Sequence, residues 1–216
     1  MKRLLLILLV LLQGSGLVQA QESDPDALSL MKAMKSKYEA YNNMLIDFEL
    51  RIKDLDTDIE ELKRGELIIS GNKFRLDIDS QLIITDNATI WTYLQDVNEV
   101  QINYYEPEEE DFITPSKLFI LDVREYYIIL GVHMVEEGRK IQVIELSPLD
   151  KELSYHTIKL FVDEKAKTIV RGQILEKDGI HITYGINGFK TNVKLDQNSF
   201  KFLPANYPGI EIISLK

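Results

Sequence analysis

Three histidines, His133, His156 and His181, are the residues of this sequence that could act as acids, bases or metal ligands near neutral pH. They lie far apart in the chain, and none has a second ligand at the spacing that metal sites use. The patterns H-E-x-x-H, G-x-S-x-G, G-x-G-x-x-G and the phosphate-binding P-loop are also absent from the sequence. We therefore expect each histidine to be a surface residue of a strand, and we predict neither a metal nor a cofactor.

The 35 Asp and Glu residues could supply a pair of catalytic carboxylates. Glu60, Glu61 and Glu66 flank a predicted turn, while Asp77 and Asp79 lie on the polar side of a predicted strand. Nothing local distinguishes one of these carboxylates from the others, so only the tertiary structure could bring two of them together. We predict that the protein is not an enzyme.

The sequence contains no cysteine, which excludes disulfides, thiolate metal sites, cysteine nucleophiles and a lipidated cysteine. Lys2 and Arg3 precede an apolar run over residues 4–12, and residues 18–20 read Val-Gln-Ala. This pattern is typical of a secretory signal peptide, and the apolar run is much shorter than the roughly 20 residues that span a bilayer. We predict a signal peptide over residues 1–20, one domain over residues 21–216 and a soluble location in the bacterial periplasm.

The charge of the chain argues against two classes of partner. The formal net charge is −10, and it becomes −12 when the two positive charges of Lys2 and Arg3 are removed with the signal peptide. An acidic surface disfavours binding to nucleic acid and tight adsorption to anionic lipid. We therefore expect no nucleic acid among the partners.

Residues 25–42 show the three- and four-residue spacing of apolar side chains that predicts an amphipathic helix. Asp24 is a favourable N-cap, and Pro25 is a favourable first helical residue. The apolar positions are Ala27, Leu30, Met31, Met34, Tyr38, Tyr41 and Leu45. We expect this side of the helix to pack on the rest of the protein.

After this helix most of the chain alternates with the period of β-strands. The alternation is interrupted by an acidic run over residues 105–111, which we interpret as a solvated connector, and by a helical insertion over residues 115–128. About ten or eleven strands remain, and an antiparallel sheet of that size must curl. The predicted fold class is α+β and mainly β: a curled, incompletely closed antiparallel β-barrel whose concave face is covered by the N-terminal helix and the helical insertion.

Residues 82–94 depart from the alternation. A half-exposed strand alternates apolar and polar side chains, but the runs around Ile83 and around Trp91, the single tryptophan, are apolar on both faces. The second face must be covered by a helix, by another sheet or by something that is not part of this chain. We interpret it as the inner face of a cavity that helices close as a lid.

Five segments carry a specific order of elements: the strand 48–52, the strand-turn-strand segment 65–78, the segment 82–102 with its Trp-x-Tyr, the helix start 114–119, and the ending 200–213 with its Phe-x-Phe and Pro-Gly pairs. Together they resemble the LolA family of periplasmic lipoprotein carriers. The resemblance implies a half-closed β-barrel with helices over its mouth and a cavity for lipoprotein acyl chains. It also implies partners: an inner-membrane lipoprotein-releasing ABC transporter and an outer-membrane receptor.

The receptor of such a system is itself a lipoprotein, and this chain has no cysteine for lipid attachment. It therefore resembles the carrier, and we expect a monomer that binds acylated lipoproteins or lipid. The underside of the lid would be formed by Met31, Met34 and Tyr38, with Phe119 on the second lid element. The sheet would be lined by Phe74, Leu76, Ile83, Trp91, Tyr93, Ile182 and Tyr184. Taken singly, each of these residues is better explained as ordinary core, because a helix that rests on a sheet needs the same apolar stripe.

The sequence departs from the family pattern at one turn. Many carriers have an arginine there that helps to hold the lid closed, whereas this chain has Ser70, Gly71 and Asn72. Arg75 lies one pleat further on and is not equivalent. Three other functions stay open: an envelope module that senses lipoproteins or stress, a carrier of a different lipid, and a hydrolase with scattered carboxylates.

Overall fold

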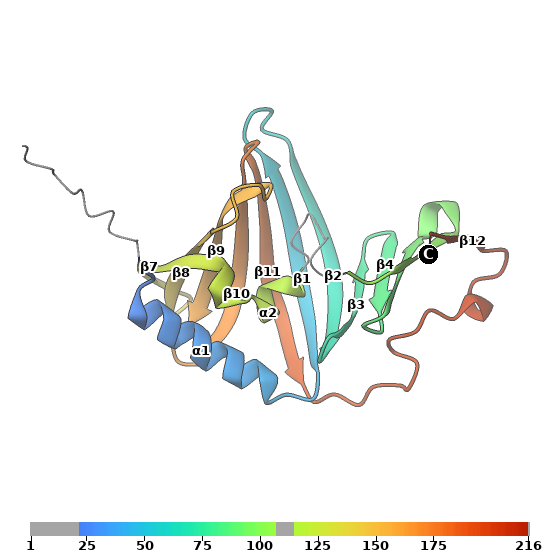
Figure 1. Cartoon of the computed structure of the whole chain (residues 1–216), viewed down its shortest axis with the longest axis horizontal. Coiled ribbons are helices and arrows are strands. Elements are labelled where there is room, and N and C mark those ends of the chain that lie inside the picture. The colour runs from blue at the N-terminus through green and yellow to red at the C-terminus, as the bar shows by residue number, and fades with distance from the viewer. Residues whose placement is uncertain (1–21, 107–114, 216) are drawn as a thin grey trace, which may run out of the picture.

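The structure is a computed structural model that describes residues 22–106 and 115–215 (Figure 1). Its strands form one twelve-stranded sheet in the order β12-β6-β5-β4-β3-β2-β1-β11-β10-β9-β8-β7. The strands are β1 (Met44–Asp54), β2 (Glu60–Ser70), β3 (Lys73–Ile78), β4 (Gln81–Thr85), β5 (Thr89–Leu94), β6 (Glu99–Tyr104), β7 (Tyr126–Glu136), β8 (Arg139–Pro148), β9 (Tyr155–Asp163), β10 (Thr168–Glu176), β11 (Ile180–Thr191) and β12 (Glu211–Ser214). Neighbours are antiparallel except β12 and β6, which pair in parallel.

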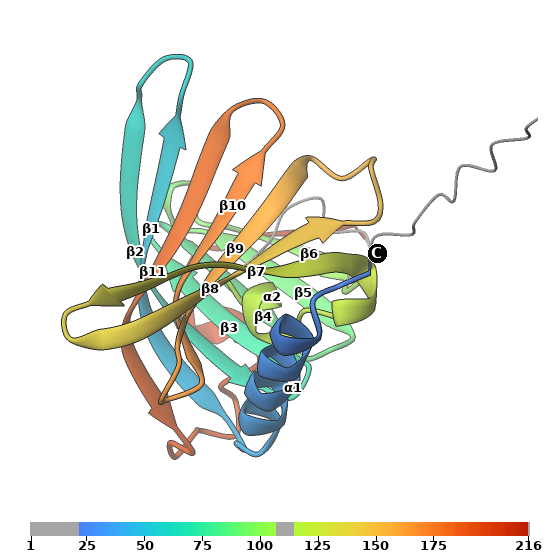
Figure 2. The ribbon, with the colours of Figure 1, turned by 90° about the vertical axis from the view of Figure 1, so that its left-hand side faces the viewer.

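The predicted fold class is confirmed. The strands β12 and β7 are the two edges of the order, so the described strands curl without closing into a barrel. The helices are α1 (Pro25–Glu39), α2 (Lys117–Ile120) and the short 3-10 helices η1 (Gln95–Val97), η2 (Val123–Glu125) and η3 (Pro204–Asn206). Two views at right angles show α1 across one side of the curled sheet (Figures 1 and 2).

Two predicted boundaries are wrong. The sequence predicts the helical insertion over residues 115–128, but β7 begins at Tyr126. The described residues also hold twelve strands, where about ten or eleven were predicted. The pattern also predicts that the first helix reaches residue 42, but it ends at Glu39. The chain beyond it bonds to β11 and the residues after it instead: the Asn42 amide donates to Asn192 Oδ1 at 2.8 Å, and Asn43 exchanges hydrogen bonds with Val193. Tertiary hydrogen bonds therefore end the helix.

The start of α1 is capped as the sequence predicts. The Asp24 side chain accepts hydrogen bonds from the amides of Asp26 and Ala27. The same cap fixes the helix to the sheet, because the Asp24 amide donates to the Ile128 carbonyl at 2.8 Å and the Ile128 amide donates to Ser23 Oγ at 2.9 Å. The helix is thus attached to β7 at one end and, through the residues that follow it, to the end of β11 at the other.

Strand register decides which side chains share the face under α1. Ile46 of β1 lies opposite Leu67 of β2 and Phe189 of β11, and Leu67 in turn lies opposite Leu76 of β3. Directly opposite residues project from the same face of a sheet. This concave face carries the main buried cluster, which includes the apolar side of α1 and both Leu118 and Phe119 of α2.

The opposite, convex face of β4, β5 and β6 is covered by the chain itself. Leu82, Ile84 and Val100 project there, and Phe202 from the C-terminal segment packs on them. This segment runs alongside the part of the sheet that contains β3 and β4 and leads to β12 (Figure 1). The two-sided apolar pattern of residues 82–94 therefore has an internal explanation. One face belongs to the concave core, and the other is covered by residues 200–210.

The predicted signal peptide over residues 1–20 lies outside the described residues, as do most of the acidic run and Thr114. Within residues 22–106 and 115–215, no helix combines the length and the apolar character needed to cross a membrane.

Candidate functional site

The candidate site is the concave surface beneath α1 and α2, which we call the concave core. Its buried members are apolar or aromatic and come from α1, α2 and eight strands. Among the described residues the buried polar side chains are Thr85, Thr89 and Ser116, and no charged side chain is buried. Such a surface can hold an apolar molecule, but it offers no buried ion to bind a charged one.

Helix α2 sits on the sheet in a notch made by a glycine. Gly172 of β10 lies opposite Leu160 and Tyr184, both of which belong to the concave core. A Cβ atom at position 172 would lie 2.5 Å from Leu118 Cδ1, closer than such atoms approach in proteins. Leu118 occupies the space that a side chain would take, so the absence of one at Gly172 lets α2 lie directly on β10.

An aromatic cluster joins both helices to the sheet. The ring of Tyr38 in α1 meets the ring of Phe119 in α2 edge-on, with 5.3 Å between their centroids. Both rings also contact Phe189 of β11, at 6.2 and 6.4 Å. Pairs of this geometry contribute about 0.5–1.5 kcal/mol beyond their buried area. We call Tyr38, Phe119 and Phe189 the aromatic latch, because their rings join α1, α2 and β11.

The hydroxyl of Tyr38 ties α1 to β10. It accepts a hydrogen bond from the Ile169 amide at 2.8 Å, and both residues are buried. Burial raises the pKa of the Tyr38 hydroxyl, while the hydrogen bond from Ile169 acts in the opposite direction. Next to it, the Lys37 ammonium donates to the Ala166 carbonyl. The last turn of α1 is therefore held by polar contacts as well as by packing.

The sheet beneath the helices is also shaped by a glycine. Phe48 of β1 packs against Tyr184 of β11 with 5.8 Å between ring centroids. A Cβ atom at Gly65 of β2 would lie 2.5 Å from Phe48 Cζ, so the ring lies over the bare backbone of β2. Burial raises the pKa of the Tyr184 hydroxyl.

A pair of tyrosines lies in the concave core near the β7 edge. The hydroxyl oxygens of Tyr126 and Tyr155 are 2.9 Å apart, and both side chains are buried. Burial raises the pKa of both hydroxyls, and the hydrogen bond between them raises the pKa of Tyr126 further. One hydroxyl donates to the other, and this hydrogen bond offsets part of the cost of burying the pair.

The structure gathers most of the predicted site residues in the concave core. Met31, Met34, Tyr38, Phe74, Leu76, Phe119 and Tyr184 are buried members, and Ile83 and Ile182 pack against them. Their shared surface is thus established, while their role in binding stays a prediction. Phe189, Leu118 and Gly172 were not predicted. A large aromatic residue in an alternating strand was the only signal for Phe189.

Two predicted residues lie elsewhere, which corrects the expectation that they line the concave face. Trp91 lies opposite Ile84, and Tyr93 lies opposite Leu82, so both project from the convex face into the second cluster. The reason is register. A loop one residue longer or shorter between β4 and β5 would turn every side chain of β5 to the other face. The sequence shows that both faces are apolar but does not say which residues share one.

The turn that lacks the expected arginine is tied to α1 in another way. Ser70 Oγ donates to the carbonyl of Asn42, just beyond the helix, at 2.9 Å. In the described residues, α1 and α2 contact each other partly through the aromatic latch. Aromatic packing and the Ser70 hydrogen bond therefore connect these elements where the family resemblance led us to expect an arginine.

The three histidines lie on three different strands, β7, β9 and β11. His133 and His156 are exposed, and His181 is half-buried. His133 Nε2 lies 3.0 Å from Glu164 Oε1 in a pair that is open to solvent. No group of three or more His, Asp or Glu side chains in the described part of the chain could hold a metal ion.

An unclosed antiparallel sheet that carries an apolar surface beneath helices is the class of structure to which this chain belongs. The family model described as "Outer membrane lipoprotein carrier protein LolA" matches residues 40–203. The match covers more than half of the chain, which therefore belongs to the LolA family.

Individual relatives are distant. The outer-membrane lipoprotein carrier protein of Xanthomonas axonopodis pv. citri (strain 306) is 22% identical over 176 residues, which cover 77% of this chain and 79% of the relative. An uncharacterized conserved protein from Thermus thermophilus has a similar structure, with a TM-score of 0.55, 10% identity and coverage of 87% of this chain and 98% of that chain. A DUF1329 family protein from Desulfovibrio piger has a TM-score of 0.51, 13% identity and coverage of 83% and 98%. These structural matches show the fold alone.

Proposed function

We propose that this protein is a periplasmic carrier that shields the acyl chains of lipoproteins and takes them from the inner to the outer membrane. One observation carries the proposal: a continuous apolar concave face lies under two helices, one of which is a single turn held by Leu118 and Phe119. Membership of the LolA family and the similarity to a lipoprotein carrier support it. We infer binding without catalysis.

The physical task of such a carrier is to keep hydrocarbon out of water. Each CH₂ group removed from water contributes about 0.8 kcal/mol, so a chain of about 16 carbons contributes on the order of 12 kcal/mol. The concave core can supply the matching apolar surface. Methionines such as Met31 and Met34 suit this task, because their flexible side chains adapt to ligands of different shape.

The two helices are held to the sheet by different contacts. Helix α1 is bonded to β7 before its first turn, to β10 through Tyr38 and to the end of β11 after its last turn. The four residues of α2 enter the concave core through two side chains, Leu118 and Phe119. We infer that acyl chains enter by displacing α2 from the Gly172 notch and from the aromatic latch, while α1 stays in place.

The partners follow from the same proposal. Cargo would come from an inner-membrane lipoprotein-releasing ABC transporter and pass to an outer-membrane receptor, with the carrier acting as a monomer. Release requires that the helices and the cargo compete for one surface. Closure of α2 over the concave core then offsets part of the free energy of binding and lets the cargo leave.

The test uses a fluorescent reporter under the lid. Trp91 is unsuitable because it lies on the convex face. We would replace it by phenylalanine and introduce Phe119→Trp, with Val97→Trp, at an exposed position outside the concave core, as the matched control. A triacylated lipopeptide and the same peptide without acyl chains would be titrated into each variant.

We expect saturable binding of the acylated peptide only, with a fluorescence change at position 119 and none at position 97. Binding without a change at position 119 would place the ligand outside the concave core. Absence of binding by the acylated peptide would overturn the carrier function itself.

A further inference from the structure

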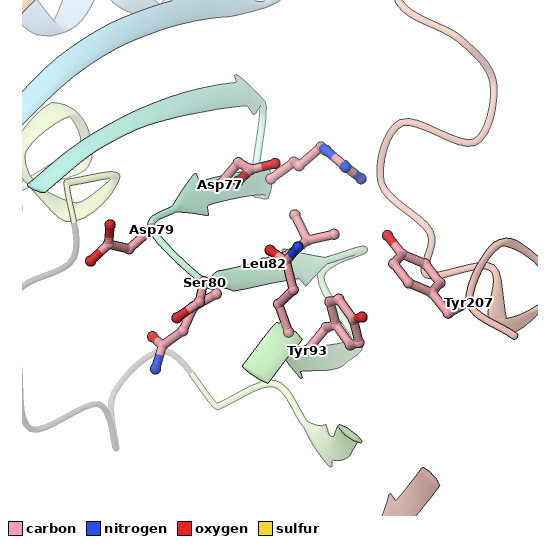
Figure 3. A pocket seen from close by; sticks show the side chains of 9 residues that line it. Asp77, Asp79, Ser80, Leu82, Tyr93 and Tyr207 are labelled. Carbon is pink, nitrogen blue, oxygen red and sulfur yellow. The ribbon is translucent and has the colours of Figure 1, made fainter. Parts of the chain in front are cut away.

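A hollow lies on the convex face, away from the concave core. Its volume is about 270 Å³, and it opens between the β3–β4 hairpin and the C-terminal segment. Arg75 and Asp77 of β3 project from the same face as Leu82 and Tyr93, because Asp77 lies opposite Leu82 and Leu82 lies opposite Tyr93. Tyr207 of the C-terminal segment stands across from them, and Asp77, Leu82 and Tyr93 approach the same space (Figure 3).

One side of the hollow is a fixed aromatic wall. The rings of Tyr93 and Tyr207 lie 4.5 Å apart, and Phe202 stacks on Tyr207 at 4.6 Å. The Tyr93 hydroxyl lies 3.1 Å from Asn98 Oδ1, and Asn98 Nδ2 donates to the Pro208 carbonyl at 3.3 Å. These contacts join the C-terminal segment to the sheet and hold the wall in place before any ligand arrives.

The other side is polar, and its charged lining residues are one arginine and two aspartates. The side chains of Arg75, Asp77 and Gln95 make no hydrogen bond or ion pair with any residue that the structure describes. The carboxylate of Asp79, at the end of the hollow, lies 4.0 Å from the Lys63 ammonium. The same ammonium lies 3.6 Å from Glu61, so the formal charges of Arg75 and Asp77 cancel while Asp79 leaves the lining slightly acidic. The hollow offers donors from Arg75, acceptors from Asp77 and both from Gln95.

This combination selects a ligand chemistry. Groups that donate and accept at once, such as hydroxyls, match a wall that carries both functions. The negative face of an aromatic ring attracts the C–H groups of a sugar ring. An anion would meet Asp77 and the net charge of −10, and an acyl chain would leave Arg75 and Asp77 unsatisfied. The volume is slightly below the roughly 300–1,000 Å³ of drug-sized sites, which suits one small polar unit.

We propose that the hollow lined by Arg75, Asp77, Leu82, Tyr93, Gln95 and Tyr207 binds a neutral sugar unit, either a monosaccharide or one residue of a longer glycan. The site lies on the opposite face of the sheet from the concave core and does not depend on the proposed carrier function. It is completed by the C-terminal segment, so a bound sugar also holds that segment against β5.

The experiment follows backbone amide signals of the full ¹⁵N-labelled chain by NMR. The probes are the methyl glycosides of glucose, galactose, mannose and N-acetylglucosamine, each titrated into the millimolar range. We expect at least one to cause saturable shifts confined to residues 75–82, 93–95 and the surroundings of Tyr207. Absence of saturable shifts with all four sugars would overturn the proposal.

Three variants locate the site. Asp77→Asn and Arg75→Gln each remove a charged hydrogen-bonding group at the surface without changing the fold, and each is expected to weaken sugar binding about tenfold. Arg64→Gln is the matched control, because this arginine is 81% exposed on β2 and does not line the hollow. Sugar binding that is unchanged in both Asp77→Asn and Arg75→Gln would also overturn the assignment. Lipopeptide binding is expected to be the same in all three variants.

Discussion

The notch at Gly172 gives a sharp test of whether α2 moves. Gly172→Ala places a methyl group 2.5 Å from Leu118 Cδ1, and Leu118 is only 2% exposed, so its side chain has little room to turn away. Overpacking of this kind costs about 1–3 kcal/mol. The cost falls on the closed arrangement, in which α2 lies on β10. It is absent once α2 has left.

The variant is therefore expected to lose stability and gain affinity. If closure of α2 competes with cargo, each 1.4 kcal/mol removed from the closed state raises apparent affinity about tenfold, until the open state dominates. Urea unfolding measures the first effect, and titration with the triacylated lipopeptide measures the second. Lipopeptide binding that is weaker than in the unsubstituted protein would refute the idea that α2 must move.

Two further variants separate the contact from general effects of the substitution. Gly185→Ala is the matched control in the neighbouring strand, because a Cβ there meets only the Glu49 carbonyl oxygen at 4.0 Å. It is expected to leave affinity unchanged and stability equal or slightly higher, since alanine loses less backbone entropy than glycine on folding. In a Leu118→Ala background, Gly172→Ala should cost almost nothing. An equal cost in both backgrounds would show that the methyl group acts elsewhere.

Three other outcomes are expected. Tyr38→Phe should lower the free energy of unfolding by about 1–3 kcal/mol, because the buried Ile169 amide loses its acceptor. The control Tyr41→Phe should change it little, and equal losses in urea unfolding would contradict this prediction. Gly65→Ala should prevent native folding, as judged by circular dichroism, because its methyl group would lie 2.5 Å from Phe48 Cζ and 2.7 Å from the Asp77 carbonyl oxygen, a backbone atom that cannot turn away; native-like stability would show that the sheet adapts. The buried tyrosines of the concave core have a raised pKa and keep their protons in the folded protein. The free energy of unfolding should therefore be constant from about pH 7 to 9 and fall above about pH 10, where the tyrosines of the unfolded chain ionise. A free energy of unfolding that stays constant up to about pH 11 would contradict this.

Much of the architecture could be predicted because it depends on short-range patterns. The cap at Asp24 and the three- and four-residue spacing that follows specify α1 locally. Alternation specifies strands, and a large antiparallel sheet has to curl. The apolar side of β3 and that of α1 were assigned correctly for the same reason: within one element, periodicity determines which residues share a side. Leu45 was assigned to the helix by the same spacing, but it lies in β1 and is not part of the concave core.

Relations between elements could not be predicted. Whether Trp91 faces the same way as Ile83 depends on the register of β4 with β5, and a change of one residue in the loop reverses it. The end of α1 depends on Asn192 and Val193, which lie far away in the chain. The aromatic latch and the notch at Gly172 likewise join residues that have no local relation.

The sequence by itself therefore determined the fold class, the capped helix and an apolar stretch that needs cover on both faces. The tertiary structure decided what the cover is: α1 and α2 on the concave face, and the chain's own C-terminal segment on the convex face. The physical reason is that burial of apolar area is non-directional. A pattern of apolar residues indicates how much surface must be buried, but only the packed chain shows which segment covers that surface.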